Sequence, residues 1–203
     1  MLLEAKNVGF HYRKGPWLLQ NINLTVAEGE SIALVGPSGY GKSTLAKILS
    51  GYLKSNQGEV LLDGRPLPMR GYSPVQLIYQ HPEKAVNALW RMKDILNEGW
   101  TPDTVTLEAM GIESAWLERW PAELSGGELQ RFCIARALGP KTKFLIADEM
   151  TTMLDTITQA QIWELMLKIL KERHMGLIVV THNAALAQKV CNRIISLPEL
   201  NQQ

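Results

Sequence analysis

Residues 36–44 read GPSGYGKST and fit the phosphate-binding pattern G-x-x-x-x-G-K-[ST]. The run follows a short apolar segment, Ser31–Val35, that predicts a buried strand, and it opens a predicted helix over residues 42–50. Glycines let the backbone curl so that N–H groups point at phosphate oxygens, and the helix N-terminus adds positive potential. This context predicts a nucleoside triphosphate site. The alternative is a glycine-rich turn that carries a lysine by chance.

Within this loop, we expect Lys42 to place its charge on the β- and γ-phosphates and Ser43 to offer its hydroxyl to Mg²⁺. The loop alone does not separate kinases, GTPases, helicases and transporters. The predicted nucleotide-binding residues in it are Gly36, Pro37, Ser38, Gly39, Tyr40, Gly41, Lys42, Ser43 and Thr44.

Residues 144–149 form an apolar run that ends in two acids. A carboxylate at the C-terminal end of a strand is well placed for the Mg²⁺ beside the phosphates, and Asp148 fits that role. Glu149 follows directly and can accept a proton from an attacking water as a general base. The alternative is a strand that ends in a solvated acidic turn.

A third motif, LSGGE at residues 124–128, stands at the start of a predicted helix over residues 126–138. Ser125 is a favourable helix N-cap, and Gly126 and Gly127 free the backbone to approach an anion. The chain therefore holds two helix N-termini suited to phosphate, unless this second one is an ordinary capped helix start.

Strands alternate with helices along most of the chain, which indicates an α/β fold with a mostly parallel, covered sheet. Residues 90–120 differ, because their pattern is helical with breaks at residues 101–102 and at Gly111. We expect one domain, residues 1–203, with an inserted helical subdomain at about residues 85–138. Further strands are predicted at residues 2–10, 17–26, 59–62, 144–147, 177–180 and 193–197, and further helices at residues 157–173 and 183–190.

Composition narrows the class of protein. The chain has 203 residues, of which 46% are hydrophobic and 20% charged, so it can bury an ordinary globular core. A net charge of +1 gives no electrostatic reason to expect nucleic acid as a partner. The N-terminus predicts neither a signal peptide nor an anchor, and no apolar run approaches the ~18 residues of a membrane span. We therefore expect other chains to supply any membrane part.

Together these motifs resemble the ABC (ATP-binding cassette) ATPases from the first strand to the last. Residues 124–128 are similar to the family signature LSGGQ, with Glu128 in place of glutamine. The resemblance implies a P-loop NTPase fold with an N-terminal antiparallel β portion and a small helical lobe. It also implies ATP hydrolysis by head-to-tail dimers, in which Ser125, Gly126 and Gly127 face the ATP held by the partner cassette.

Other positions follow from the resemblance one by one. Tyr12 matches the aromatic that stacks on adenine, or else it is a core aromatic beside Phe10. Gln80 matches the glutamine that senses Mg²⁺ and water, or else it is a loop amide. His182 matches the histidine at the γ-phosphate, or else it belongs to a helix cap. The implied catalytic residues are Glu149, His182, Lys42 and Gln80, the implied metal ligands are Ser43, Gln80 and Asp148, and Asp155 lies in the loop exchanged across the dimer.

Residues 79–88 resemble the corresponding stretch of ATPases in dipeptide, oligopeptide and nickel importers, although Ala88 replaces a proline. The resemblance implies a second cassette, identical or different, together with permease subunits and a substrate-binding protein, on the cytoplasmic side of the membrane. Such cassettes often extend beyond the last strand, and this chain ends at Gln203, so we expect no role for such a tail. The alternatives are a soluble ABC ATPase in translation or DNA repair, and a P-loop kinase for a small molecule.

Four of the six tryptophans fall in or beside the predicted lobe. Large rings can build a core from few residues, which is the first interpretation. Aromatic residues also anchor interfaces, so one or two of them could receive a short helix of a membrane subunit. The four are Trp90, Trp100, Trp116 and Trp120.

Overall fold

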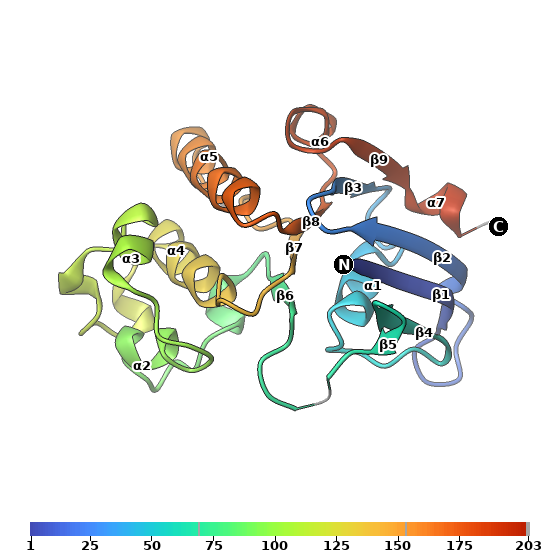
Figure 1. Ribbon diagram of the computed structural model, residues 1–203, viewed down its shortest axis with the longest axis horizontal. Coiled ribbons are helices and arrows are strands. Elements are labelled where there is room, and N and C mark those ends of the chain that lie inside the picture. Colours follow the sequence, from blue (N-terminus) through green and yellow to red (C-terminus); the bar gives the residue numbers. More distant parts are fainter. Residues whose placement is uncertain (69, 153, 202–203) are drawn as a thin grey trace.

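A computed structural model describes residues 1–68, 70–152 and 154–201. Figure 1 shows an antiparallel sheet at one end, a parallel sheet in the middle and a group of helices at the other end. The antiparallel sheet has the strand order β2-β1-β4-β5. Its strands are β1 (Leu2–Phe10), β2 (Leu19–Ala27), β4 (Gln57–Leu62) and β5 (Arg65–Pro66).

The second sheet is parallel throughout and has the order β6-β7-β8-β3-β9. This confirms the expected α/β fold with a mostly parallel sheet and an N-terminal antiparallel portion. Among the helices of the described ranges, none is both long enough and apolar enough to cross a bilayer. The strands are β3 (Ser31–Val35), β6 (Val75–Ile78), β7 (Phe144–Asp148), β8 (Gly176–Val180) and β9 (Arg193–Ser196), and the longer helices are α1 (Lys42–Leu49), α4 (Gly126–Ala137), α5 (Thr156–Glu172) and α6 (Ala184–Val190).

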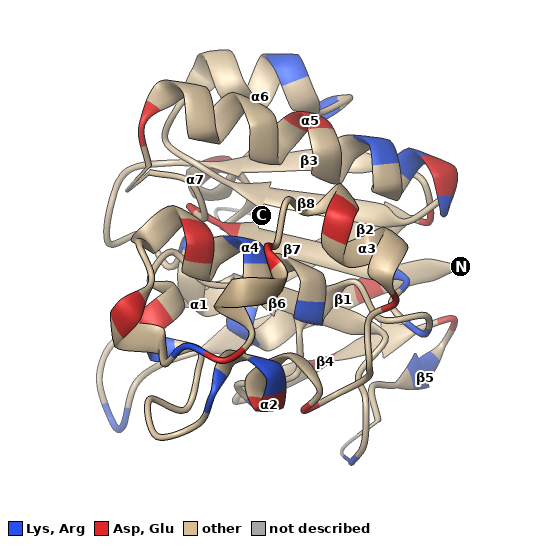
Figure 2. Ribbon diagram, turned by 90° about the vertical axis from the view of Figure 1, so that its left-hand side faces the viewer, with Lys and Arg blue, Asp and Glu red and all other residues tan. Residues whose placement is uncertain are grey.

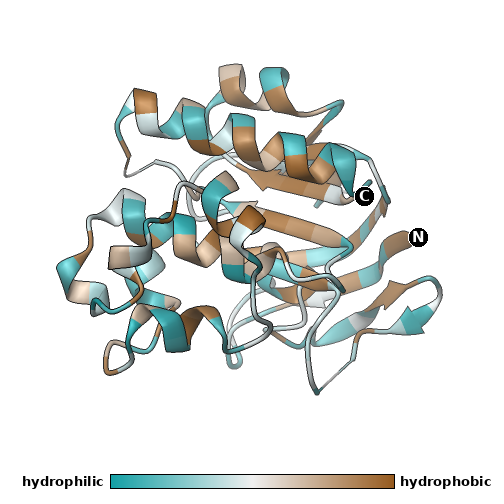
Figure 3. Ribbon diagram, turned by 60° about the vertical axis from the view of Figure 1, so that its left-hand side comes forward, coloured by the Kyte–Doolittle hydropathy of each residue, from teal (hydrophilic) through white to brown (hydrophobic). Residues whose placement is uncertain are grey.

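Strands β7 and β8 are buried at every position, and alternate residues point into two different cores. Leu145 and Leu177 belong to a core shared with α4, α5 and the helices at the lobe end. Phe144 and Ile178 belong to a core shared with α1 and the antiparallel sheet. Figure 3 shows these central strands as hydrophobic along their length, whereas the helices that cover them are mixed. Burial on both faces explains why each strand reads as a continuous apolar run.

The lobe end holds less regular helix than the sequence pattern predicts. Its helices before α4 are short, and 3₁₀ turns precede them at Pro82–Lys84 and follow them at Ser114–Trp116 and Pro121–Glu123. The expected breaks are where α3 starts and stops, because Asp103 caps its first turn and Gly111 follows its end with a φ of 61°. The two short helices are α2 (Met92–Leu96) and α3 (Thr104–Ala109).

Four strands differ from the sequence-based expectation. Strand β6 was not predicted, because it has only four residues and includes the polar Gln76. The strand predicted from residue 17 begins at Leu19, so Trp17 lies in the preceding loop. The last strand ends at Ser196, after which α7 (Leu197–Leu200) starts with a proline in its first turn, a position that favours helix initiation. Strand β5 is a two-residue edge pairing and was also missed.

The four lobe tryptophans divide into two pairs. Trp116 is buried in the core, and Trp100 is half-buried with its Nε1 donating to the Arg136 carbonyl at 2.9 Å. Trp90 is 42% exposed and Trp120 is 40% exposed, the latter with the Arg91 guanidinium 5.0 Å from its ring centroid. The core interpretation therefore suits the first pair, and the second pair lies on the surface.

We predict that Trp116→Ala lowers the free energy of unfolding by about 3 to 5 kcal/mol, because it leaves a cavity in the core. Trp90→Ala is the matched control and should change it by less than about 0.5 kcal/mol. Chemical denaturation followed by circular dichroism measures both. Equal losses for the two variants would contradict this assignment.

Candidate nucleotide site

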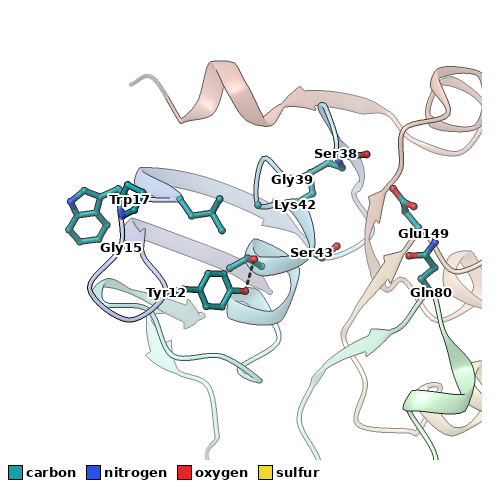
Figure 4. Close-up of a pocket in the computed structure, with 13 residues that line it drawn as sticks. Tyr12, Gly15, Trp17, Ser38, Gly39, Lys42, Ser43, Gln80 and Glu149 are labelled. Carbon is teal, nitrogen blue, oxygen red and sulfur yellow. Dashed lines mark hydrogen bonds between the residues drawn. The ribbon is translucent and has the colours of Figure 1, made fainter.

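A cavity of about 620 Å³ opens beside the glycine-rich loop, a size suited to a nucleotide-like ligand. Figure 4 shows residues from several elements converging on it. The loop after β1 forms one wall, the start of α1 forms the floor, and the ends of β6 and β7 form the opposite side. The lining residues are Tyr12, Gly15, Pro16, Trp17, Leu18, Ser38, Gly39, Gly41, Lys42, Ser43, Thr44, Gln80 and Glu149.

The glycine-rich loop is curled around the ammonium group of Lys42. Lys42 Nζ donates to the Gly36 carbonyl at 2.7 Å and to the Pro37 carbonyl at 2.9 Å. Gly41 has a φ of 97°, in the left-handed region that glycine tolerates, and the helix α1 starts directly after it. The loop is therefore closed around the lysine, and Ser38, Gly39, Gly41 and Lys42 all line the cavity. Tyr40 is 49% exposed and does not line the cavity.

Ser43 and Asp148 meet at the base of the site, where Ser43 Oγ donates to Asp148 Oδ1 at 3.0 Å. Burial raises the pKa of Asp148, the hydrogen bond from Ser43 lowers it, and the charge of Glu149 raises it. A cation here would stabilise the buried carboxylate. The described residues contain no group of three His, Cys, Asp or Glu side chains that could hold a metal.

Glu149 lies on the cavity wall with its backbone in the left-handed region, at a φ of 47°. Its N–H donates to the Val180 carbonyl at 3.0 Å, and its Oε1 lies 3.1 Å from His182 Nδ1. Left-handed backbone at a residue other than glycine costs energy and clusters at functional sites. The helix cap that could have occupied His182 is supplied by Asn183, whose side chain accepts from the Leu186 N–H.

Tyr12 is 56% exposed, so it is not a core aromatic. Its hydroxyl lies 3.1 Å from Thr44 Oγ1, which ties the loop after β1 to helix α1. Trp17 is 39% exposed and lines the same wall, a position that the sequence analysis missed by assigning it to a strand. The available signal was an aromatic residue directly after the Gly15-Pro16 turn.

Ser125, Gly126, Gly127 and Asp155 do not line this cavity. They lie close to one another instead, since a Cβ on Gly127 would be 3.2 Å from Thr158 Cγ2, and Asp155 accepts hydrogen bonds at the start of the same helix, α5. The chain therefore carries the phosphate cradle and the LSGGE segment as two separate surfaces.

Glu128 closes a capping box at the start of α4. Its carboxylate accepts from the Ser125 N–H at 2.6 Å, and its own N–H donates to Ser125 Oγ at 3.3 Å. The Ser125 hydroxyl accepts this bond and also hydrogen-bonds the Glu128 carboxylate. The hydrogen bond from the Ser125 backbone lowers the pKa of Glu128, so the carboxylate stays ionised near neutral pH.

We predict that Glu128→Ala lowers the free energy of unfolding by about 1 kcal/mol near pH 7. A lowered folded-state pKa gives stability above the unfolded pKa that is lost as the pH falls through the folded pKa. The difference between wild type and Glu128→Ala should therefore shrink in acid. Glu128→Gln keeps an oxygen acceptor without the charge. The difference in free energy of unfolding between Glu128→Gln and Glu128→Ala should therefore not change with pH. A wild-type advantage over Glu128→Ala that stays constant down to acidic pH would contradict this.

Comparisons with known proteins agree with this geometry. The sequence model of the ABC transporter family matches residues 19–152. The chain is 35% identical to the nickel import system ATP-binding protein NikE of Staphylococcus aureus (strain bovine RF122 / ET3-1), over 98% of this chain and 87% of that protein.

Solved structures show the same fold. The ATP-binding cassette MJ0796, in a dimeric post-hydrolysis state bound to ADP and Pi, superposes with a TM-score of 0.80 at 28% identity, covering 96% of this chain and 93% of that one. The protein cbiO1 from Clostridium perfringens, part of the ABC transporter complex cbiONQ, gives a TM-score of 0.78 at 25% identity, covering 96% and 83%.

Proposed function

Because this chain belongs to the ABC transporter family, as one of its ATP-hydrolysing subunits, we propose that it powers an importer of nickel, peptides or a related small solute. The observation that carries this proposal is the similarity to a nickel import ATP-binding protein over 98% of the chain. Residues 79–88 support the same branch of the family. Selectivity for the solute would lie in the membrane and binding subunits.

In this proposal, ATP occupies the 620 Å³ cavity with adenine against Tyr12 and its phosphates in the loop of residues 36–44. Lys42 contacts the β- and γ-phosphates through its ammonium group. Ser43, Asp148 and Gln80 would hold Mg²⁺, which supplies positive charge against the phosphate oxygens.

Glu149 accepts a proton from the attacking water, and His182 orients its carboxylate across the 3.1 Å contact. Catalysis then depends mainly on positioning and on fixed charge, as is usual for phosphoryl transfer.

A second cassette completes each site. Ser125, Gly126 and Gly127 lie outside the cavity of their own chain, so they are free to face ATP in another subunit, and Asp155 lies beside them. The related cassette MJ0796 forms dimers in its solved structures. The second cassette is identical or related, and it works with permease subunits and a substrate-binding protein at the cytoplasmic face of the membrane.

We also propose a single domain for this chain. Residues 1–203 form one ATP-binding domain, with a helical subdomain at about residues 85–138 that packs on one face of the parallel sheet. Figure 2 shows acidic and basic residues interspersed over this end of the molecule, which fits a protein partner better than nucleic acid.

The test is an affinity purification of the tagged chain from membranes solubilised in mild detergent, with mass spectrometry of the eluate. Permease subunits should co-purify, and reconstitution with them should give ATP-dependent uptake of radioactive nickel or of a labelled peptide. Recovery of ribosomes or DNA without permeases would overturn the transporter assignment.

A further inference from the structure

Thr152 joins two segments of the nucleotide site that are distant in the sequence. It lies in the turn after β7 and is exposed, and although it does not line the cavity, it contacts Gln80, which does. Gln80 Nε2 donates to Thr152 Oγ1 at 3.2 Å, and Thr152 Oγ1 donates to the Glu149 carbonyl at 3.0 Å. The hydroxyl therefore stands between the predicted metal ligand and the backbone of the predicted general base.

A threonine hydroxyl has a single proton. Thr152 uses it on the Glu149 carbonyl, so toward Gln80 the same oxygen can only accept. Only the NH₂ end of the Gln80 amide can meet that requirement. The amide oxygen must then face away from Thr152, and Figure 4 shows it on the side of Ser43.

We propose that Thr152 is a positioning residue that fixes the Gln80 amide with its oxygen toward the cation. This inference rests on the proposed role of Gln80 as a Mg²⁺ ligand. The two ends of an amide have almost the same size, so packing alone does not choose between them. The choice has a chemical consequence, because Mg²⁺ accepts oxygen ligands and an NH₂ group pointing at it would repel it.

The Glu149 carbonyl is the second group held by Thr152. It accepts from the Thr152 N–H at 3.2 Å as well as from the hydroxyl. These two bonds hold the turn at the point where Glu149 has left-handed backbone. One side chain thus positions the amide of Gln80 and supports the main chain of Glu149.

The test measures Mn²⁺, as a probe for the metal, by electron paramagnetic resonance on the full chain loaded with a non-hydrolysable ATP analogue. Thr152→Val replaces the hydroxyl by a methyl group of equal size and should weaken Mn²⁺ binding about ten-fold, the effect of losing an outer-shell partner. Thr152→Ser keeps the hydroxyl and should restore wild-type binding. Thr156→Val, at an exposed threonine at the start of α5, is the matched control and should bind as wild type.

Binding of the analogue in excess EDTA separates positioning from general damage to the pocket, and it should be unchanged in Thr152→Val. If Thr152→Val binds the analogue more weakly than wild type in excess EDTA, the inference is overturned. So would Mn²⁺ binding of wild-type strength in Thr152→Val, because a simple turn hydrogen bond to Glu149 would give that result.

A double-mutant cycle separates this inference from the proposed function. Gln80→Ala should weaken Mn²⁺ binding, and adding Thr152→Val should cost nothing further, because residues that act through one contact are not additive. If Gln80→Ala binds Mn²⁺ as wild type, the proposed role of Gln80 fails. If Gln80→Ala binds weakly while the two losses add in full, Gln80 keeps its role and the inference about Thr152 fails.

Discussion

Replacing Glu149 by glutamine should lower kcat for ATP hydrolysis by a factor of about 10² to 10⁴, the usual contribution of a general base. Glutamine keeps the size of the side chain and a contact to His182, but it cannot take a proton from water. ATP affinity should stay near that of wild type, since Lys42 and the loop around it are intact. Phosphate release and equilibrium binding of a fluorescent ATP analogue measure the two quantities.

The same variant should accumulate as a dimer in ATP, because the closed state forms and does not turn over. Light scattering with and without ATP checks this. Glu164→Gln is the matched control, since Glu164 is exposed on α5 away from the cavity, and it should hydrolyse ATP normally. Normal turnover by Glu149→Gln would remove Glu149 from its role.

Replacing Lys42 by alanine should weaken ATP binding about 10- to 100-fold, the value of a charge-assisted hydrogen bond. The ammonium group also holds the Gly36 and Pro37 carbonyls, so its removal loosens the loop that receives the phosphates. Both effects act in the same direction. Isothermal titration with a non-hydrolysable analogue and Mg²⁺ measures the affinity.

Lys54→Ala is the control for loss of one positive charge, because Lys54 is exposed and does not line the cavity. Its ATP affinity should equal that of wild type. Adenosine lacks phosphates, so its weak binding should change little in Lys42→Ala. A loss of adenosine binding as large as that of ATP would show that the whole pocket had collapsed.

Local patterns predicted the central fold well. The apolar runs of β3, β7 and β8 are buried strands, and the glycine-rich turn after β3 opens α1 as expected. Strand β6 escaped because its four residues become a strand only through pairing with β7, from Val75 opposite Phe144 to Ile78 opposite Ala147. Such pairing joins segments about 70 residues apart, and a local window does not contain it.

The candidate site likewise has residues that local sequence predicts and residues that only the folded arrangement reveals. Motif spacing predicted Lys42, Ser43, Asp148 and Glu149, and all four meet at one edge of the parallel sheet, although Asp148 does not itself line the cavity. Thr152 was not predicted, because its importance comes from a contact with a loop 72 positions away. Contacts of that kind follow from the folded arrangement and leave no periodic trace in the sequence.

Strands β7 and β8 are packed against side chains on both faces, and β7 ends at Asp148, directly before Glu149. Protein interiors are close-packed and hardly compressible, so a strand gripped on both sides cannot slide without opening voids in two cores. Asp148 therefore ends a strand that packing holds in place from both sides, and Glu149 follows it directly. A conformational change driven by ATP would therefore have to occur in the loops that surround the nucleotide site and in the surfaces attached to them.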